Sequence, residues 1–265
     1  MQAPPGFTPA VDMATLSRRV FWLGFYTAIL AAWALLMRLS ASPLPGMTAA
    51  EYWAALCMAA DNADPWALFA MWGLMSAAMM LPTFTPALRV FGELGEVRAT
   101  SGGSMLAMAA GYGVLWLGFA GAAAAWQFGL ARAGALSGAG QALTPWLSAL
   151  LLFASGAYQF TPAKAACLAK CRHPLLFFME HWAPGSKAAF AMGIRLGAWC
   201  VGCCWLLMLF GFVGGAMNLM WMGAATLFMT LEKLPEIGRH LTRPLGLLLV
   251  IAALAQSVTL LSSGG

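Results

Sequence analysis

Long apolar segments alternate with short polar segments along the chain. The apolar segments cover residues 20–38, 66–86, 104–128, 144–163, 188–213, 215–232 and 243–261. A helix rises about 1.5 Å per residue, so about 20 residues cross a hydrocarbon core roughly 30 Å thick. The pattern therefore predicts an all-α protein, a polytopic transmembrane helical bundle of about seven spans. Residues 20–261 would form this single domain, after a loose N-terminal segment of residues 1–19.

The composition indicates that a lipid bilayer surrounds this bundle. Hydrophobic residues make up 62% of the 265 residues and charged residues 9%, whereas soluble domains contain about 25% charged residues. The net charge of +5 does not indicate a nucleic-acid partner, because the sequence has no basic cluster with interleaved aromatic residues. The Lys and Arg residues lie instead at the ends of the apolar segments.

These basic residues also predict an orientation. With the N-terminus inside, all of the 14 Lys and Arg residues except Arg38 and Arg132 fall at or near the inner face, as the positive-inside rule requires. Seven spans then place the C-terminus outside, which gives an N-in, C-out topology. The first apolar segment is longer than the apolar core of a signal peptide, so we expect it to be retained as a span.

The fifth apolar segment contains the most distinctive chemistry. Cys200, Cys203 and Cys204 occupy positions i, i+3 and i+4, so a helix places their sulfurs on roughly one face. Counting depth along straight helices places them near the middle of the membrane, level with Met75 and Met79 of the second segment. Thiolates and thioethers select Cu(I), and thiolates also bind zinc. The pattern predicts a sulfur-rich metal site, and the alternative is that these residues pack the bundle.

A second cysteine motif lies in the polar connection between the fourth and fifth spans. Cys167 and Cys171 form C-x3-C on a predicted helical extension at the inner face, beside Lys170, Arg172 and His173. Neighbouring cations lower the pKa of a thiol and favour the thiolate that binds metal. His173 could add a nitrogen ligand, although a loop histidine is more often only solvated. We expect this motif to receive or release the ion at a different depth from the first.

Several polar residues inside the apolar segments are candidates for supporting roles. Tyr158 and Gln159 reach a depth comparable with that of the cysteines, and Asn218 could form a hydrogen bond across helices. Arg195 and Glu232 could meet near the inner boundary, where an unpaired charge is costly. We expect them to be a pair that locks the bundle rather than a catalytic pair.

The order and spacing of these motifs are similar to those of a bacterial family of uncharacterised, predicted metal-binding integral membrane proteins. The resemblance rests on residues 71–82, 157–174, 197–208, 214–222 and 231–233, a little over half of the chain together with the spans that carry them. It implies an inner-membrane location and metal binding, but no reaction. The candidate residues that it carries over are Cys167, Cys171, Cys200, Cys203, Cys204, Met75, Met79, Met80, Tyr158, Gln159, Met217 and Asn218.

The leading functional prediction is an integral membrane protein that handles or transfers a soft metal ion, with copper favoured and zinc as the other candidate. A soluble metal donor or acceptor protein would be its partner. The sequence also allows a homo-oligomer. The first alternative is a membrane oxidoreductase, or an accessory subunit of one, that uses a metal or the vicinal thiols with Tyr158. The second is a structural membrane subunit. No hydrolytic triad, nucleotide-binding loop or dinucleotide fingerprint is present, so no catalytic residue is identified.

Overall fold

The computed structural model describes residues 13–40, 64–97, 102–136, 145–214 and 218–263, and these residues are overwhelmingly helical. Part of the predicted loose N-terminal segment and Met217 lie outside the described residues. The helices are α1 (Met13–Ser40), α3 (Pro65–Val97), α4 (Gly102–Arg132), α5 (Pro145–Tyr158), α6 (Pro162–Arg172), α7 (Pro174–His181), α8 (Ser186–Leu209), α9 (Gly211–Gly214), α10 (Leu219–Glu232) and α11 (Pro235–Ser263).

The all-α class is confirmed, and each predicted span has a helical counterpart. Helices α1, α3, α4, α8 and α11 are long and apolar enough to cross a membrane, whereas α5 and α10 are shorter apolar helices. Several boundaries differ from the predictions: α3 continues to Val97 instead of ending near residue 86, and α11 begins at Pro235 instead of near residue 243. Helix α1 begins at Met13, within the segment expected to be loose, and α5 ends at Tyr158. The chain leaves the helix between α5 and α6 at Thr161, which is extended (φ −76°, ψ 143°), because the residue before a proline is disfavoured in the helical region.

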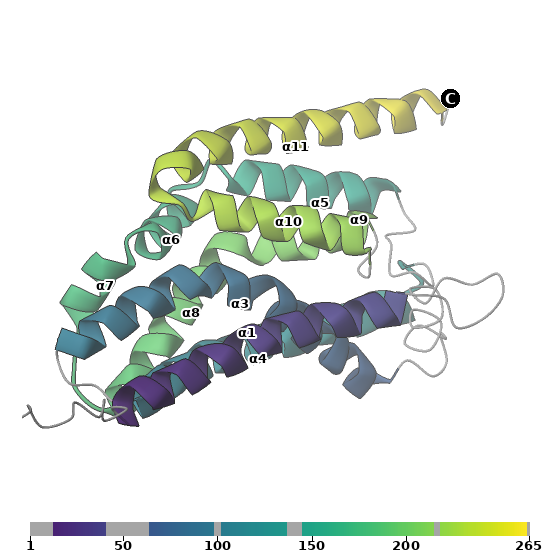
Figure 1. Cartoon of the computed structure of the whole chain (residues 1–265). Helices are drawn as coiled ribbons and strands as arrows, with labels where there is room; N and C mark the ends of the chain where they lie inside the picture. Colours follow the sequence, from purple (N-terminus) through teal and green to yellow (C-terminus); the bar gives the residue numbers. More distant parts are fainter. Residues whose placement is uncertain (1–12, 41–63, 98–101, 137–144, 215–217, 264–265) are drawn as a thin grey trace, which may run out of the picture.

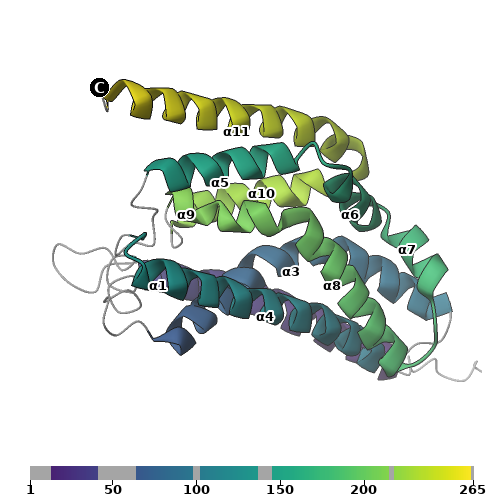
Figure 2. The same cartoon turned by 180° about the vertical axis from the view of Figure 1, so that it is seen from behind.

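The apolar helices run back and forth between two ends of the molecule. Helices α5 and α11 pack together on one side, α1, α3 and α4 lie on the other, and α8 and α10 lie between them (Figures 1 and 2). The start of α1 and the end of α11 are at opposite ends. The connection at residues 164–187 folds into α6 and α7, which cover the end at which α1 begins (Figure 1).

Backbone contact between α4 and α8 fixes the position of the cysteine-bearing helix. A Cβ added at Gly111 would lie 2.2 Å from the carbonyl oxygen of Phe190, and one added at Gly193 would lie 2.1 Å from that of Met108. Small residues allow such close approach between helices in a membrane. The Gly- and Ala-rich third span therefore packs against α8 of the same chain.

Helix α3 contains Pro82, and the side chain of a neighbouring helix compensates for the backbone bond that this proline removes. Proline has no N–H to donate to the carbonyl four residues earlier, which here belongs to Ala78. Trp33 of α1 donates its indole N–H to that carbonyl oxygen at 2.9 Å. Freed carbonyls in membrane helices need such partners, so this contact joins α1 to α3 near Met80.

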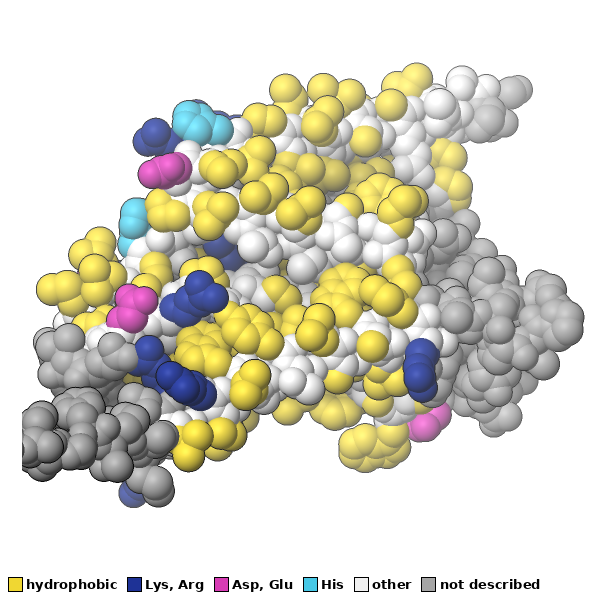
Figure 3. Space-filling model, viewed as in Figure 1, with side chains coloured by type: hydrophobic (Ala, Val, Ile, Leu, Met, Phe, Trp, Pro, Cys, Tyr) yellow, Lys and Arg dark blue, Asp and Glu magenta, His cyan; other side chains and the backbone are white. Residues whose placement is uncertain are grey.

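The surface separates apolar and charged side chains along the length of the bundle. Large apolar side chains such as Leu23 and Leu30 on α1 and Leu248 and Val258 on α11 are more than half exposed. Most charged and histidine side chains in the view of Figure 3 lie at the end that α6 and α7 cover. An apolar surface of this extent is what contact with lipid requires.

Candidate metal centre

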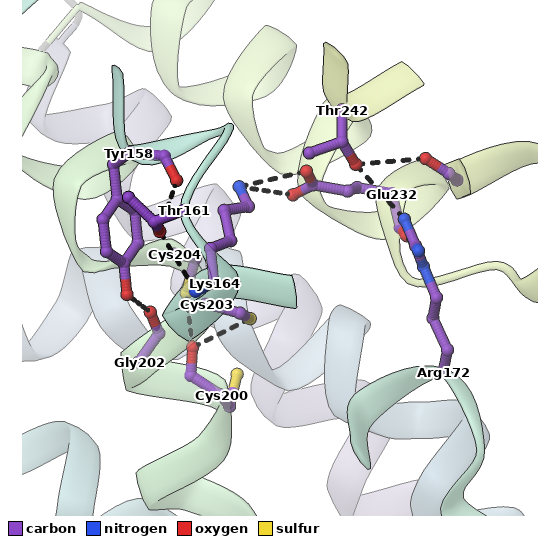
Figure 4. Close-up of polar contacts among 11 residues, drawn as sticks. Tyr158, Thr161, Lys164, Arg172, Cys200, Gly202, Cys203, Cys204, Glu232 and Thr242 are labelled. Carbon is purple, nitrogen blue, oxygen red and sulfur yellow. Dashed lines mark hydrogen bonds and ion pairs between the residues drawn. The ribbon is translucent and has the colours of Figure 1, made fainter. Parts of the chain in front are cut away.

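The three cysteines of α8 form one compact group. The Sγ atoms of Cys200, Cys203 and Cys204 all lie within 4.8 Å of one another, and each residue is at most 2% exposed. The thiols of Cys203 and Cys204 donate to the carbonyl oxygen of Cys200 at 3.1 and 2.9 Å. The predicted placement of the three sulfurs on one helix face is therefore confirmed (Figure 4).

The cysteines of α6 join this group instead of forming a separate site. Thr161 caps α6 by accepting a hydrogen bond from the backbone N–H of Lys164, and the helix then packs against α8. The thiol of Cys171 lies close enough to Cys200 and Cys203 for both to raise its pKa. The sulfur of Cys167 lies so close to Gly202 that a Cβ there would be 2.7 Å away. We name these five residues, Cys167, Cys171, Cys200, Cys203 and Cys204, the thiol cluster.

This convergence corrects the expectation of two sulfur sites at different depths. That expectation treated residues 164–187 as a connection at the membrane boundary. Because α6 folds back against α8, the C-x3-C motif lies alongside the C-x2-C-C motif. The result is one group of neighbouring thiols from two helices, in which Cys200, Cys203 and Cys204 are buried and Cys167 and Cys171 are half-buried.

The expectation that neighbouring cations lower the pKa of the α6 thiols is also wrong. Burial, followed by the nearby charge of Cys203, raises the pKa of Cys167. Hydrogen bonds with Cys200 and Cys203 raise the pKa of Cys171. The adjacent Lys170 does not act on these thiols as expected because its ammonium pairs with Glu180 at 2.7 Å on the surface.

The cation that faces the cluster is Lys233, which the sequence did not identify. Its ammonium donates to the sulfur of Cys200 at 3.0 Å and to Oγ1 of Thr83 at 2.7 Å. The hydroxyl of Tyr112 on α4 lies 3.0 Å from the same sulfur. An ammonium at this distance favours the charged thiolate, and the thiolate is the form that binds soft metal ions.

The methionine that contacts the cluster is Met80. Its Sδ lies 3.8 Å from the sulfur of Cys204, whereas Met75 and Met79 line a neighbouring cavity with Met208. The depth count from the sequence gave the level but not the direction of each side chain. Successive residues on a helix point about 100° apart, so Met79 and Met80 face different neighbours.

Glu232 forms a buried ion pair, but its partner is Lys164 and not Arg195. The ammonium of Lys164 lies 3.0 Å from each carboxylate oxygen of Glu232, and both side chains are almost fully buried. Arg195 is exposed on α8. The predicted pairing is therefore wrong. Because α6 folds back against α8, Lys164 lies at the end of α10 and takes the position expected for Arg195.

A second contact fastens α6 to the same corner. The Nε of Arg172 donates to the carbonyl oxygen of Glu232 at 2.9 Å, and a terminal nitrogen donates to Oγ1 of Thr242 on α11 at 3.2 Å. Figure 4 shows Lys164 and Arg172 reaching Glu232 from two sides. Both ends of α6 are thus held by charged side chains, which positions its cysteines over α8.

The other candidate residues have local structural roles. The hydroxyl of Tyr158 donates to the carbonyl oxygen of Gly202, and Gln159 is buried in the turn after α5. Asn218 caps α10 by accepting from the backbone N–H groups of Met220 and Trp221, and its hydrogen bond across helices stays a prediction. His173 is exposed at the corner between α6 and α7.

A cavity of about 250 Å³ gives access to the thiol cluster. Cys171 and Cys200 line it together with Lys233, Arg172 and Tyr112. It lies between α3, α6, α8 and the α10–α11 corner.

Comparison with known proteins gives one match. A family model named PpoB2 and described as a copper chaperone matches residues 69–256, more than two thirds of the chain. The match includes the second span, the thiol cluster and the cationic residues around it. No curated protein and no solved structure matches. The family is metal-related, in agreement with the metal binding that the resemblance implied.

Proposed function

We propose that this chain, which belongs to the PpoB2 copper chaperone family, is a multi-pass membrane protein that holds Cu(I) on the thiol cluster. It would exchange the ion with a soluble metal donor or acceptor protein. The observation that carries the proposal is that the half-buried cysteines of α6 lie beside the buried group of Cys200, Cys203 and Cys204 on α8. Packing alone does not require that five of the six cysteines of the chain converge.

The donor set favours Cu(I) over zinc. Thiolates bind both ions, but a thioether such as Met80 is a soft donor that suits Cu(I). Structural zinc sites are built from thiolate, imidazole or carboxylate donors, and a thioether is not among them, so the contact of Met80 with Cys204 is the feature that favours Cu(I). The buried ammonium of Lys233 would offset the negative charge of a thiolate in the presence or absence of the ion.

We place the protein in the cytoplasmic membrane of a bacterium, with seven passes, the N-terminus inside and the C-terminus outside. The alternation of the apolar helices supports the seven passes (Figure 1). The basic residues at the end covered by α6 and α7 support the orientation (Figure 3). The access cavity would then open toward the cytoplasm.

Elemental analysis of the purified full-length protein tests the function. We compare wild type with a Cys200→Ser/Cys203→Ser/Cys204→Ser variant and with Met192→Leu, which changes a buried residue of α8 outside the cluster. We expect wild type and Met192→Leu to carry about one copper per chain more than the triple variant. Equal copper in all three proteins would contradict the proposal.

A redox role for the same thiols is the second candidate, favoured by the contact of the Tyr112 hydroxyl with Cys200. In this case oxidation of the copper-free protein would convert two thiols to a disulfide reversibly. Counting free thiols by mass spectrometry before and after oxidation and reduction distinguishes the two roles. A structural subunit would show neither copper nor a reversible disulfide.

A further inference from the structure

Four buried methionines from three helices line one small cavity, which we name the methionine cavity. Met75 and Met79 belong to α3, Met208 to α8 and Met222 to α10, and each is at most 4% exposed. The cavity has a volume of about 20 Å³, enough for a single water-sized occupant. Building on the function proposed above, we propose that it is a second metal site, which binds Cu(I) or Ag(I) through thioether sulfur alone.

Packing does not account well for this arrangement. Methionine is the side chain that best fills irregular gaps, because it is flexible and polarisable. Protein interiors contain few voids as large as a water molecule. A gap that stays open among four such adaptable side chains is therefore better explained as a space for an occupant. Their sulfurs are the soft donors that select Cu(I).

The charge of the lining restricts the ion. None of the described residues that line the cavity is charged. Besides the four methionines, the lining consists of apolar and aromatic residues. Burying a charge without compensation is costly, and the cost is far larger for a divalent than for a monovalent ion. The ring of Trp221 borders the cavity, packs edge-on against Phe210 at 5.4 Å, and could add a cation–π contact. These features suit a monovalent soft cation and disfavour zinc.

The location connects this cavity to the thiol cluster. Met208 follows Cys204 by one helical turn on α8, and Met79 precedes Met80, which contacts Cys204. One turn is about 5.4 Å, so the two sites lie on neighbouring turns of α8. The cavity is displaced from the cluster toward the end opposite α6 and α7. A neutral thioether site there would be a relay position from which the ion moves to or from the charged thiols.

Nuclear magnetic resonance of the full-length protein, labelled with ¹³C at the methionine methyl groups, tests this site with Ag(I) as the probe. Signals are assigned by single Met→Leu substitutions, which conserve volume. We expect Ag(I) beyond saturation of the thiol cluster to shift the signals of Met75, Met79, Met208 and Met222. The signal of Met192, buried elsewhere on α8, should not move. A shift limited to Met80, or no shift, would overturn the proposal.

A second measurement separates this inference from the proposed function. In the Cys200→Ser/Cys203→Ser/Cys204→Ser variant, the four methyl signals should still shift, because thioethers alone hold the ion. In a Met75→Leu/Met208→Leu variant, total bound Ag(I) should fall by about one ion per chain while thiol-bound metal stays. If the serine variant keeps all its metal, the function fails and the methionine site stands. If the leucine variant binds as much Ag(I) as wild type, the methionine site is contradicted and the proposed function of the thiol cluster stands.

Discussion

The thiol cluster and the methionine cavity lie one helical turn apart on α8, at Cys204 and Met208, yet they differ in charge. A buried ammonium, a tyrosine hydroxyl and an ion pair surround the thiols, whereas the methionines lie among apolar side chains. Thiols must lose protons to bind metal, and thioethers need not. Under the proposed function, the polar residues lie where the ligand atoms would be charged and are absent from the lining of the methionine cavity.

The largest predicted effect concerns the ion pair that holds the charged region together. Lys164→Met leaves the carboxylate of Glu232 buried without its partner, so we expect a loss of about 3–5 kcal/mol in unfolding free energy. Denaturant unfolding in detergent measures it. Lys164→Met/Glu232→Leu should recover most of the loss, and Lys170→Met, on the surface, should have no measurable effect. A stable Lys164→Met protein would show that the pair does not fasten α6.

The second prediction removes the central thiol of the cluster. Cys200 contacts Tyr112 and Lys233 and hydrogen-bonds with Cys171, so Cys200→Ser should weaken Cu(I) binding by at least about 100-fold, more than loss of an outer-shell partner does. Competition with a chromophoric Cu(I) chelator measures the affinity, with Met192→Leu as control. An unchanged affinity would mean that the thiols pack and do not bind.

The third prediction tests the charge difference directly. Lys233→Met removes the ammonium but keeps an unbranched side chain, and we expect Cu(I) affinity at the thiol cluster to fall about 10- to 100-fold. Thr83→Val removes the other partner of that ammonium and serves as the matched control, with a smaller effect. If Lys233→Met binds as tightly as wild type, the charge beside Cys200 does not assist the metal.

The smallest effect should come from the methionine cavity. Met75→Leu/Met208→Leu removes two thioethers and no charge, so Cu(I) affinity of the thiol cluster should change by less than about threefold, as for other volume-conserving swaps. The same chelator competition measures it. A large loss would show that the two regions form one site, and the comparison between them would no longer hold.

Much of the helical framework follows from the sequence, because apolar length and cysteine spacing are local properties. The seven apolar segments and the shared face of Cys200, Cys203 and Cys204 depend only on helix periodicity. Lateral packing is not encoded locally in that way. The fold-back of α6 depends on contacts between Lys164 and Glu232, which are 68 residues apart.

The residues that surround the cysteines could not be predicted from the sequence for a related reason. Lys233 directly follows an apolar segment, as the basic residues at the other segment ends do, and only its pairing in sequence with Glu232 distinguishes it. Tyr112 lies in a Gly- and Ala-rich segment with no motif around it. Met80 was among the candidates carried over by resemblance, but depth alone could not distinguish its direction from that of Met79.

The central claim is that the two cysteine motifs form a single Cu(I) site, and one titration tests it. Tight Cu(I) stoichiometry is measured for Cys167→Ser/Cys171→Ser, for Cys200→Ser/Cys203→Ser/Cys204→Ser and for their combination. A single site predicts that each set of substitutions weakens the same bound ion and that the combination removes no additional tightly bound copper. Two independent sites predict that each variant keeps one tightly bound ion and that only the combination loses both, which would contradict the account.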